Sequence, residues 1–154
     1  MDKNPEKNEA GQPGDDAPRF LLKGQYIKDL SFENPHAPMS LLSLREPPKV
    51  DMNVNLGAQK VQEHLYELVM SISVRAVGER TLFLADLVYG GLFELHNIPE
   101  DKIEQLVLVD CAFILYPFAR RVIADVTRDG AFPPLMLEPI DFFRLFVENK
   151  NKAA

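Results

Sequence analysis

The chain has 154 residues, enough to bury one core without disulfides or metals, and we expect a single main domain. With 46% hydrophobic and 26% charged residues and no long apolar run, the composition argues against a membrane-spanning segment. The net charge of −6 disfavours nucleic-acid binding and predicts that any electrostatic partner is basic. The one cysteine, Cys111, has no partner for an internal disulfide, which fits a reducing compartment such as the cytoplasm.

The first 18 residues are polar and contain no β-branched or aromatic side chain. Such a segment cannot bury enough apolar surface to offset the entropy lost on ordering, and it lacks the apolar stretch of a secretory signal. The sequence therefore predicts a disordered leader at residues 1–18, a folded domain at residues 19–148 and a flexible C-terminal tail at residues 149–154.

The middle of the chain has the alternating pattern of β-strands, which we expect at residues 20–32, 50–56, 64–77 and 81–89. The first strand ends before Asn34-Pro35-His36-Ala37-Pro38, because proline lacks a donor and biases the preceding residue away from helix. Gly78-Glu79-Arg80 supplies the turn between the last two strands. Connections this short favour an antiparallel sheet.

Two helices are expected after the strands. The first begins at Pro99, has acidic residues at its positive end, and ends at Gly130. Pro117 lies inside its apolar pattern and predicts a kink or a split nearby. The second is a short helix at residues 139–146. Strands followed by helices predict the α+β class.

The stretch YIKDLSFENPHAP at residues 26–38 places Asp29, Ser31 and Glu33, here called the acidic row, on one face of the first strand. If the first and fourth strands expose the same face, Asp86 and Glu79 add to a negative patch that suits a small basic partner. The same charges would also serve as a solubilising face that prevents edge-to-edge aggregation. Both interpretations are open from these residues alone.

The fourth strand is apolar on both faces, although one subunit's helices can cover only one of them. The remaining apolar surface must contact another subunit, an unfolded client, or both. Adaptable aromatic and methionine side chains suit a groove for varied extended segments. The candidate groove residues are Phe83, Leu87, Tyr89, Phe132, Leu135, Phe142 and Phe146. The alternative is that the same aromatic residues fill the core and an oligomer interface.

The first helix is apolar on nearly all sides, which is typical of a helix buried on both sides. In so small a chain, such burial predicts a partner subunit. The candidate interface residues are Ile103, Leu106, Cys111, Ile114 and Phe118.

Catalysis is not expected. Cys111 with His64 or His96 is the only nucleophile–base combination, and burial in an apolar helix suppresses thiol reactivity. Three scattered histidines and one cysteine lack metal-ligand spacing. Gly90-Gly91 lacks the lysine and the glycine spacing of a phosphate loop, and we interpret it as a turn or bulge. The sequence predicts no metal and no cofactor.

Four stretches resemble the bacterial protein-export chaperone family SecB: YIKDLSFENPHAP, FLADLVYGGLF, ILYPFARRVIADVTRDGAFPPLML and EPIDFFRLF. They occur in order between residues 26 and 146, so in register the resemblance extends over nearly the whole chain after the leader. The resemblance implies a homotetramer, a dimer of dimers, whose subunit has a four-stranded antiparallel sheet and two helices. It also implies an ATP-independent holdase that keeps precursors of exported proteins unfolded and delivers them to the translocation ATPase SecA.

The resemblance further implies that Asp29, Glu33, Leu84 and Asp86 dock the small zinc-bearing C-terminal segment of SecA, so any zinc belongs to SecA. Asp86 stands where the family has glutamate, which keeps the charge and shortens its reach. The C-terminus is basic where many members are acidic, which puts a second SecA contact in doubt. The main rival to a holdase is an adaptor module that oligomerises and binds one folded partner.

Overall fold

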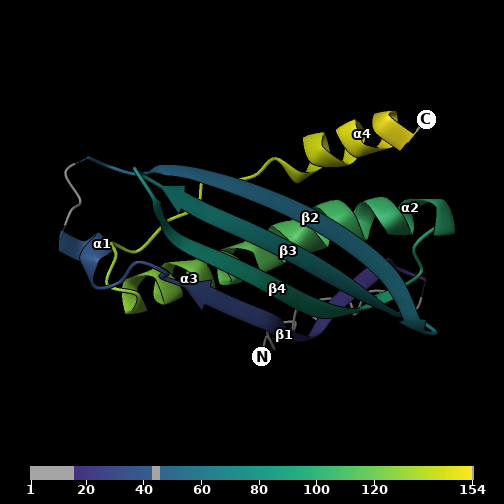
Figure 1. The fold of residues 1–154 in the computed structure, drawn as a ribbon. Helices are drawn as coiled ribbons and strands as arrows, with labels where there is room; N and C mark the ends of the chain where they lie inside the picture. Colours follow the sequence, from purple (N-terminus) through teal and green to yellow (C-terminus); the bar gives the residue numbers. More distant parts are fainter. Residues whose placement is uncertain (1–15, 43–45, 154) are drawn as a thin grey trace, which may run out of the picture.

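Four antiparallel strands and a long helix that crosses one face of their sheet make up the architecture (Figure 1). The computed structural model describes residues 16–42 and 46–153. The α+β class and the four-stranded antiparallel sheet are confirmed. The elements are β1 (Arg19–Glu33), α1 (Met39–Leu42), β2 (Lys49–Gln62), β3 (Leu65–Val77), β4 (Thr81–His96), α2 (Glu100–Gln105), the π-helix η1 (Leu106–Cys111), α3 (Ala112–Asp129) and α4 (Phe142–Ala153).

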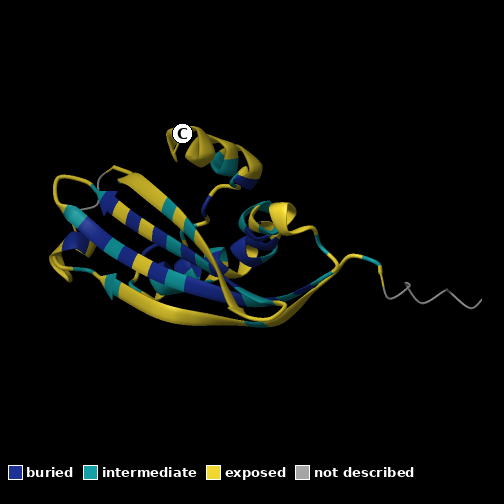
Figure 2. Ribbon diagram, turned by 90° about the vertical axis from the view of Figure 1, so that its right-hand side faces the viewer, coloured by how far each residue is buried: buried dark blue, intermediate teal, exposed yellow. Residues whose placement is uncertain are grey.

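The strand order in the sheet is β1-β4-β3-β2, so β1 and β2 form the two edges. Short turns join β2 to β3 and β3 to β4; the second turn is predicted from Gly78-Glu79-Arg80, whereas β2 continues six residues beyond its predicted end at Leu56. The chain crosses from β1 to the opposite edge and returns strand by strand until β4 pairs with β1. The edge strands are mostly exposed, whereas residues of β3 and β4 alternate between buried and less buried (Figure 2).

The core lies between the sheet and the long helix. Even-numbered residues of β3 and odd-numbered residues of β4 share the face that packs against α3; we call this the helix-side face and its opposite the outer face. The buried helix residues recur every three or four positions, so one stripe meets the sheet. The fully buried side chains of this core include Leu68, Met70, Ile72, Leu87, Phe93, Val107, Leu115 and Ile123.

The predicted long helix forms α2, η1 and α3 in continuous succession and ends before Gly130. It does not split at Pro117, which lies inside α3. The irregularity is instead the π-helical turn at Leu106–Cys111, N-terminal to the proline. π-Turns widen a helix by one residue, and their position cannot be read from the apolar spacing.

The last helix differs from its predicted bounds. It begins at Phe142 because Asp141 caps it: the Arg144 backbone N–H donates to Asp141 Oδ1 at 3.0 Å. It continues to Ala153, so residues 149–153 are helical, not the separate tail we expected. Lys150 fixes this end through its ion pair with Glu104, with Nζ 3.2 Å from Oε2. The predicted leader falls mostly on residues 1–15, outside the described part of the chain.

Gly90 and Gly91 lie within β4, so the prediction of a turn or bulge at this pair is wrong. Each glycine leaves room on a different face. A Cβ on Gly90 would lie 2.4 Å from a ring carbon of Tyr26, and a Cβ on Gly91 would lie 2.6 Å from a methyl of Leu115 on α3. The pair therefore marks two close approaches to a strand that continues to His96.

Candidate functional site: an acidic face on the sheet

The acidic row of β1 lies beside β4 on the outer face of the sheet. The register aligns Glu33 with Leu84 and Ser31 with Asp86, and cross-strand partners point to the same face. Asp29 shares this face because it lies two residues before Ser31. The structure therefore brings together the four predicted docking residues, here called the docking face: Asp29, Glu33, Leu84 and Asp86.

A bulge in β1 turns the acidic row outward. Ile27 pairs with Tyr89, which is buried on the helix-side face, but Asp29 pairs with Val88, the very next residue of β4. Lys28 is therefore an extra residue, and strict alternation resumes only after it. Without this bulge, Asp29 and Glu33 would point to the helix-side face.

The neighbouring strand β3 completes the surroundings of the docking face. Ser73 lies opposite Asp86, and its hydroxyl donates to Asp86 Oδ1 at 2.6 Å. Arg75 lies opposite Leu84 and donates to Thr81 Oγ1 at 3.2 Å. Within the described ranges Arg75 forms no ion pair. The docking face is thus negative, with one cation beside its apolar residue.

Asp29 and Glu33 are exposed, and neither forms an ion pair with any other residue of the described part. Their charges are therefore free to act on an approaching partner. Carboxylates held on a sheet steer a basic partner and select it more than they add raw affinity. Glu79, which we expected near this patch, lies in the exposed turn between β3 and β4.

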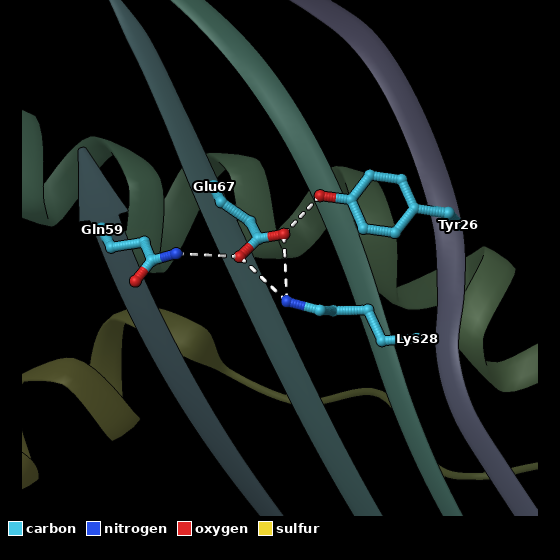
Figure 3. A network of polar contacts seen from close by, with 4 residues as sticks. All are labelled: Tyr26, Lys28, Gln59 and Glu67. Atoms are coloured by element: carbon cyan, nitrogen blue, oxygen red, sulfur yellow. Dashed lines mark hydrogen bonds and ion pairs between the residues drawn. The ribbon is translucent and has the colours of Figure 1, made fainter. Parts of the chain in front are cut away.

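Beside the acidic row, a buried carboxylate ties three strands together (Figure 3). Glu67 on β3 has a side chain only 10% exposed. Tyr26 on β1 donates its hydroxyl to Glu67 Oε2 at 2.5 Å. Lys28 Nζ lies 3.1 and 3.2 Å from the two carboxylate oxygens, and Gln59 Nε2 on β2 donates to Oε1 at 3.2 Å.

The network shifts the pKa values of its two acids in opposite directions. The hydrogen bond from Tyr26, followed by the bonds and charge of Lys28, lowers the pKa of Glu67 despite the opposing effect of its burial. Burial, followed by the hydrogen bond and charge of Glu67, raises the pKa of Tyr26 to about 12. This network was not predicted from the sequence. It could have been suspected from Glu67, the only carboxylate within the apolar segment 65–77, because a carboxylate in a buried strand needs partners.

Five of the predicted groove residues pack inside the subunit, and this corrects the prediction: Phe83, Leu87, Tyr89, Phe132 and Phe142. The ring of Phe132 folds back to lie 4.9 Å from that of Phe83, and the ring of Phe142 lies 5.6 Å from that of Tyr116. The alternation in β4 could not show which of its apolar faces the helix covers. Leu135 and Phe146 remain partly exposed.

An exposed apolar surface with a pocket lies between the start of β1, the long helix and the beginning of α4. Phe113 is 72% exposed and Phe143 is 53% exposed. A pocket of about 490 Å³ opens here, lined by Phe20, Val109, Asp110, Phe113, Ile114, Ile140, Asp141, Phe142 and Phe143. The sequence analysis named only two of these residues, Ile114 and Phe142, in any site.

Among the predicted interface residues, Cys111 is fully buried against its own sheet, so it does not belong to an exposed face. Burial, and then the charge of Asp110, raises the pKa of its thiol to about 12. Phe118 is 38% exposed, and the other three, Ile103, Leu106 and Ile114, are partly buried.

Residues 16–42 and 46–153 contain no cluster of three histidine, cysteine or acidic side chains able to bind a metal. No helix within these ranges has the length and apolar character needed to span a bilayer. The rings of His64 and His96 lie against each other, with centroids 4.5 Å apart. His96 Nε2 also lies 2.6 Å from Glu94 Oε1.

Residues 13–153 match the family described as "Preprotein translocase subunit SecB". The chain is 47% identical over 141 residues to the protein-export protein SecB of Bartonella bacilliformis, covering 88% of this chain and 89% of that protein. It is 43% identical over 148 residues to that of Rhodopseudomonas palustris, covering 95% and 94%. A Mycobacterium tuberculosis SecB-like chaperone, solved with a ChAD peptide from the HigA1 antitoxin, shares the fold with a TM-score of 0.68 and 20% identity, covering 79% of this chain and 91% of that one.

Proposed function

Because this chain belongs to the SecB family of protein-export chaperones, we propose that it holds unfolded precursors without ATP and delivers them to SecA. The proposal places the chain in the cytoplasm, since precursors must be held before they are translocated. It includes no catalytic step, metal or cofactor.

The observation that carries the SecA contact is the shared outer position of Asp29, Glu33, Leu84 and Asp86. Three carboxylates on two adjacent strands suit a small basic partner, and Leu84 adds an apolar contact opposite Glu33, at one end of the face. The hydrogen bond from Ser73 orients the shorter carboxylate of Asp86. We therefore assign the docking of the zinc-bearing segment of SecA to this face.

Client binding is assigned to the exposed apolar surface on the other side of the sheet. Its pocket, together with Leu135 and Phe146, offers aromatic and aliphatic contacts for extended segments. The SecB-like chaperone of Mycobacterium tuberculosis was solved with a bound peptide, which supports client binding as an activity of this chain. The two sites lie on opposite faces, so a client and SecA can bind together.

We assign assembly into a homotetramer, a dimer of dimers, to apolar surface outside the client pocket. Phe118 on α3 is exposed in the single subunit, and the edge strand β1 carries exposed apolar residues. The subunit contacts are assigned to these elements, with Ile103 and Leu106 alongside, whereas Ile114 lines the client pocket. Sedimentation at micromolar concentration should give the tetramer mass, and a monomer alone would contradict this assignment.

The holdase activity is tested with two unrelated unfolded precursors in the absence of nucleotide. We expect the chain to suppress aggregation of both, with dissociation constants that tolerate changes of client sequence. An adaptor module would ignore both clients and bind one folded partner. That result would replace the proposed function.

A further inference from the structure

We propose that Glu67 is a positioning residue for the docking face, because it anchors the β1 bulge that turns Asp29 and Glu33 outward. The inference rests on the proposed docking function and adds a residue that contacts no partner itself. Glu67 acts through Tyr26, which pairs with β4 just before the register shift, and through Lys28, the extra residue of the bulge.

The need for an anchor follows from the place of β1 in the sheet. As an edge strand, β1 is paired on one side only, by β4. A slip of one residue would move every side chain of an edge strand to the other face. At the acidic row, such a slip would turn Asp29 and Glu33 toward the helix-side face and remove the docking face.

The anchor joins the edge strand β1 to β3, which is not its neighbour in the sheet. Tyr26 and Lys28 reach from β1, past β4, to the same carboxylate on β3 (Figure 3). Gly90 makes this possible, since the Tyr26 ring occupies the space that a Cβ would fill. Gln59 donates to the carboxylate from the side of β2, which opposes a movement of the Glu67 carboxylate with β1. Because Tyr26 precedes the register shift by one residue and Lys28 is the bulged residue itself, their two contacts hold the bulge at this position of β1.

A second bulge in the same strand provides a matched control. Its register shift lies between Leu22 and Gly24, and its extra residue, Lys23, also pairs with a glutamate of the sheet. Lys23 Nζ lies 3.3 Å from Glu94 Oε2. The bulge at Lys23 lies five residues before the bulge at Lys28 and does not adjoin the acidic row. Loss of its ion pair should leave the docking face unchanged.

The test measures the affinity of each variant for a peptide with the sequence of SecA's zinc-bearing segment, loaded with zinc. We expect Glu67→Ala to weaken this binding about tenfold and Lys28→Met about threefold, with client affinity unchanged. Lys23→Met should bind the peptide like the parent chain. Glu67→Gln keeps the acceptor for Tyr26 and should recover part of the loss.

Coupling separates positioning from general destabilisation. In the Asp29→Asn/Glu33→Gln background, Glu67→Ala should cause no further loss, because the groups that it positions are already neutral. Equal losses in both backgrounds, or equal effects of Lys23→Met and Lys28→Met, would overturn the inference. If Asp29→Asn/Glu33→Gln itself left binding intact, the docking function would fail and the positioning role with it. If Asp29→Asn/Glu33→Gln weakened binding but the Glu67 and Lys28 variants had no effect, the docking function would be supported and the positioning role of Glu67 would be wrong.

A direct readout covers the case in which Glu67→Ala does not fold. Amide hydrogen exchange at residues 29–33 should be faster in Lys28→Met than in the parent chain, and unchanged in Lys23→Met. Equal exchange in all three proteins would show that the register of the acidic row does not depend on the anchor.

Discussion

Tyr26 lies directly over Gly90 of the adjacent strand, so close that an added Cβ would meet its ring at 2.4 Å. Glycine is therefore needed at this position because the Tyr26 ring occupies the space of a side chain on the outer face. The backbone conformation does not require glycine, since the φ angle of Gly90 is not positive. Through this gap the Tyr26 hydroxyl reaches Glu67, two strands away. The absence of a side chain at Gly90 thus allows Tyr26 on the edge strand β1 to bond with Glu67 on the central strand β3.

Replacing Gly90 with alanine should displace the Tyr26 ring and break its hydrogen bond with Glu67. We expect the free energy of unfolding to fall by about 1–3 kcal/mol, the usual cost of overpacking. Denaturant unfolding measures this. The matched control is Gly24→Ala, since a Cβ on Gly24 meets nothing within 4 Å. Equal losses at Gly24 and Gly90 would show that the contact with Tyr26 is not the cause.

The ionisation of Tyr26 reports on the same contact. Its folded pKa of about 12 lies above the ordinary value of 10.0, so its contribution to stability is complete below about pH 10 and is lost as the pH rises through 12. The difference in tyrosinate absorbance between the parent chain and Tyr26→Phe isolates this residue. We expect the midpoint to fall in Glu67→Gln, which removes the nearby charge. A parent midpoint near pH 10 would contradict the geometry.

The thiol of Cys111 should be inert in the folded chain. With a pKa of about 12 and no exposed surface, it presents almost no thiolate at neutral pH. Alkylation followed by mass spectrometry should show labelling only after unfolding. A control chain with Cys111→Ser and Lys102→Cys carries its thiol on an exposed position of α2 and should label at once. Rapid native labelling of Cys111 would show that the helix opens.

Arg75 should oppose the binding of a basic partner, because it lies opposite Leu84 within a negative face. Neutralising it by Arg75→Gln should tighten binding of the SecA segment about twofold, the size typical of an exposed charge pair. The control Lys60→Gln removes one positive charge from the neighbouring strand β2, at the end that lies away from Arg75. Equal tightening by both would reflect net charge alone. Weaker binding in Arg75→Gln would show that Arg75 contacts an acidic group of the partner.

Local patterns predicted the strands, the fold class and the shared face of the acidic row, because alternation and proline act over neighbouring residues. What they could not predict depends on contacts between distant residues. The outward direction of Asp29 depends on a bulge that β4 and Glu67 define. Strand β4 continues past Gly90 because Tyr26 needs the space there. The apolar face of Phe83 became core because the long helix covers that side of the sheet.

We propose that SecA binds on the outer face of the sheet and that unfolded clients bind on the opposite side. A paired measurement on Asp29→Asn/Glu33→Gln tests this separation: affinity for the zinc-loaded SecA segment and affinity for one unfolded precursor. We expect the affinity for the SecA segment to fall at least about tenfold, and more steeply at low salt, while the affinity for the precursor stays unchanged. If both affinities fell together, or neither did, the assignment of two separate faces would be wrong.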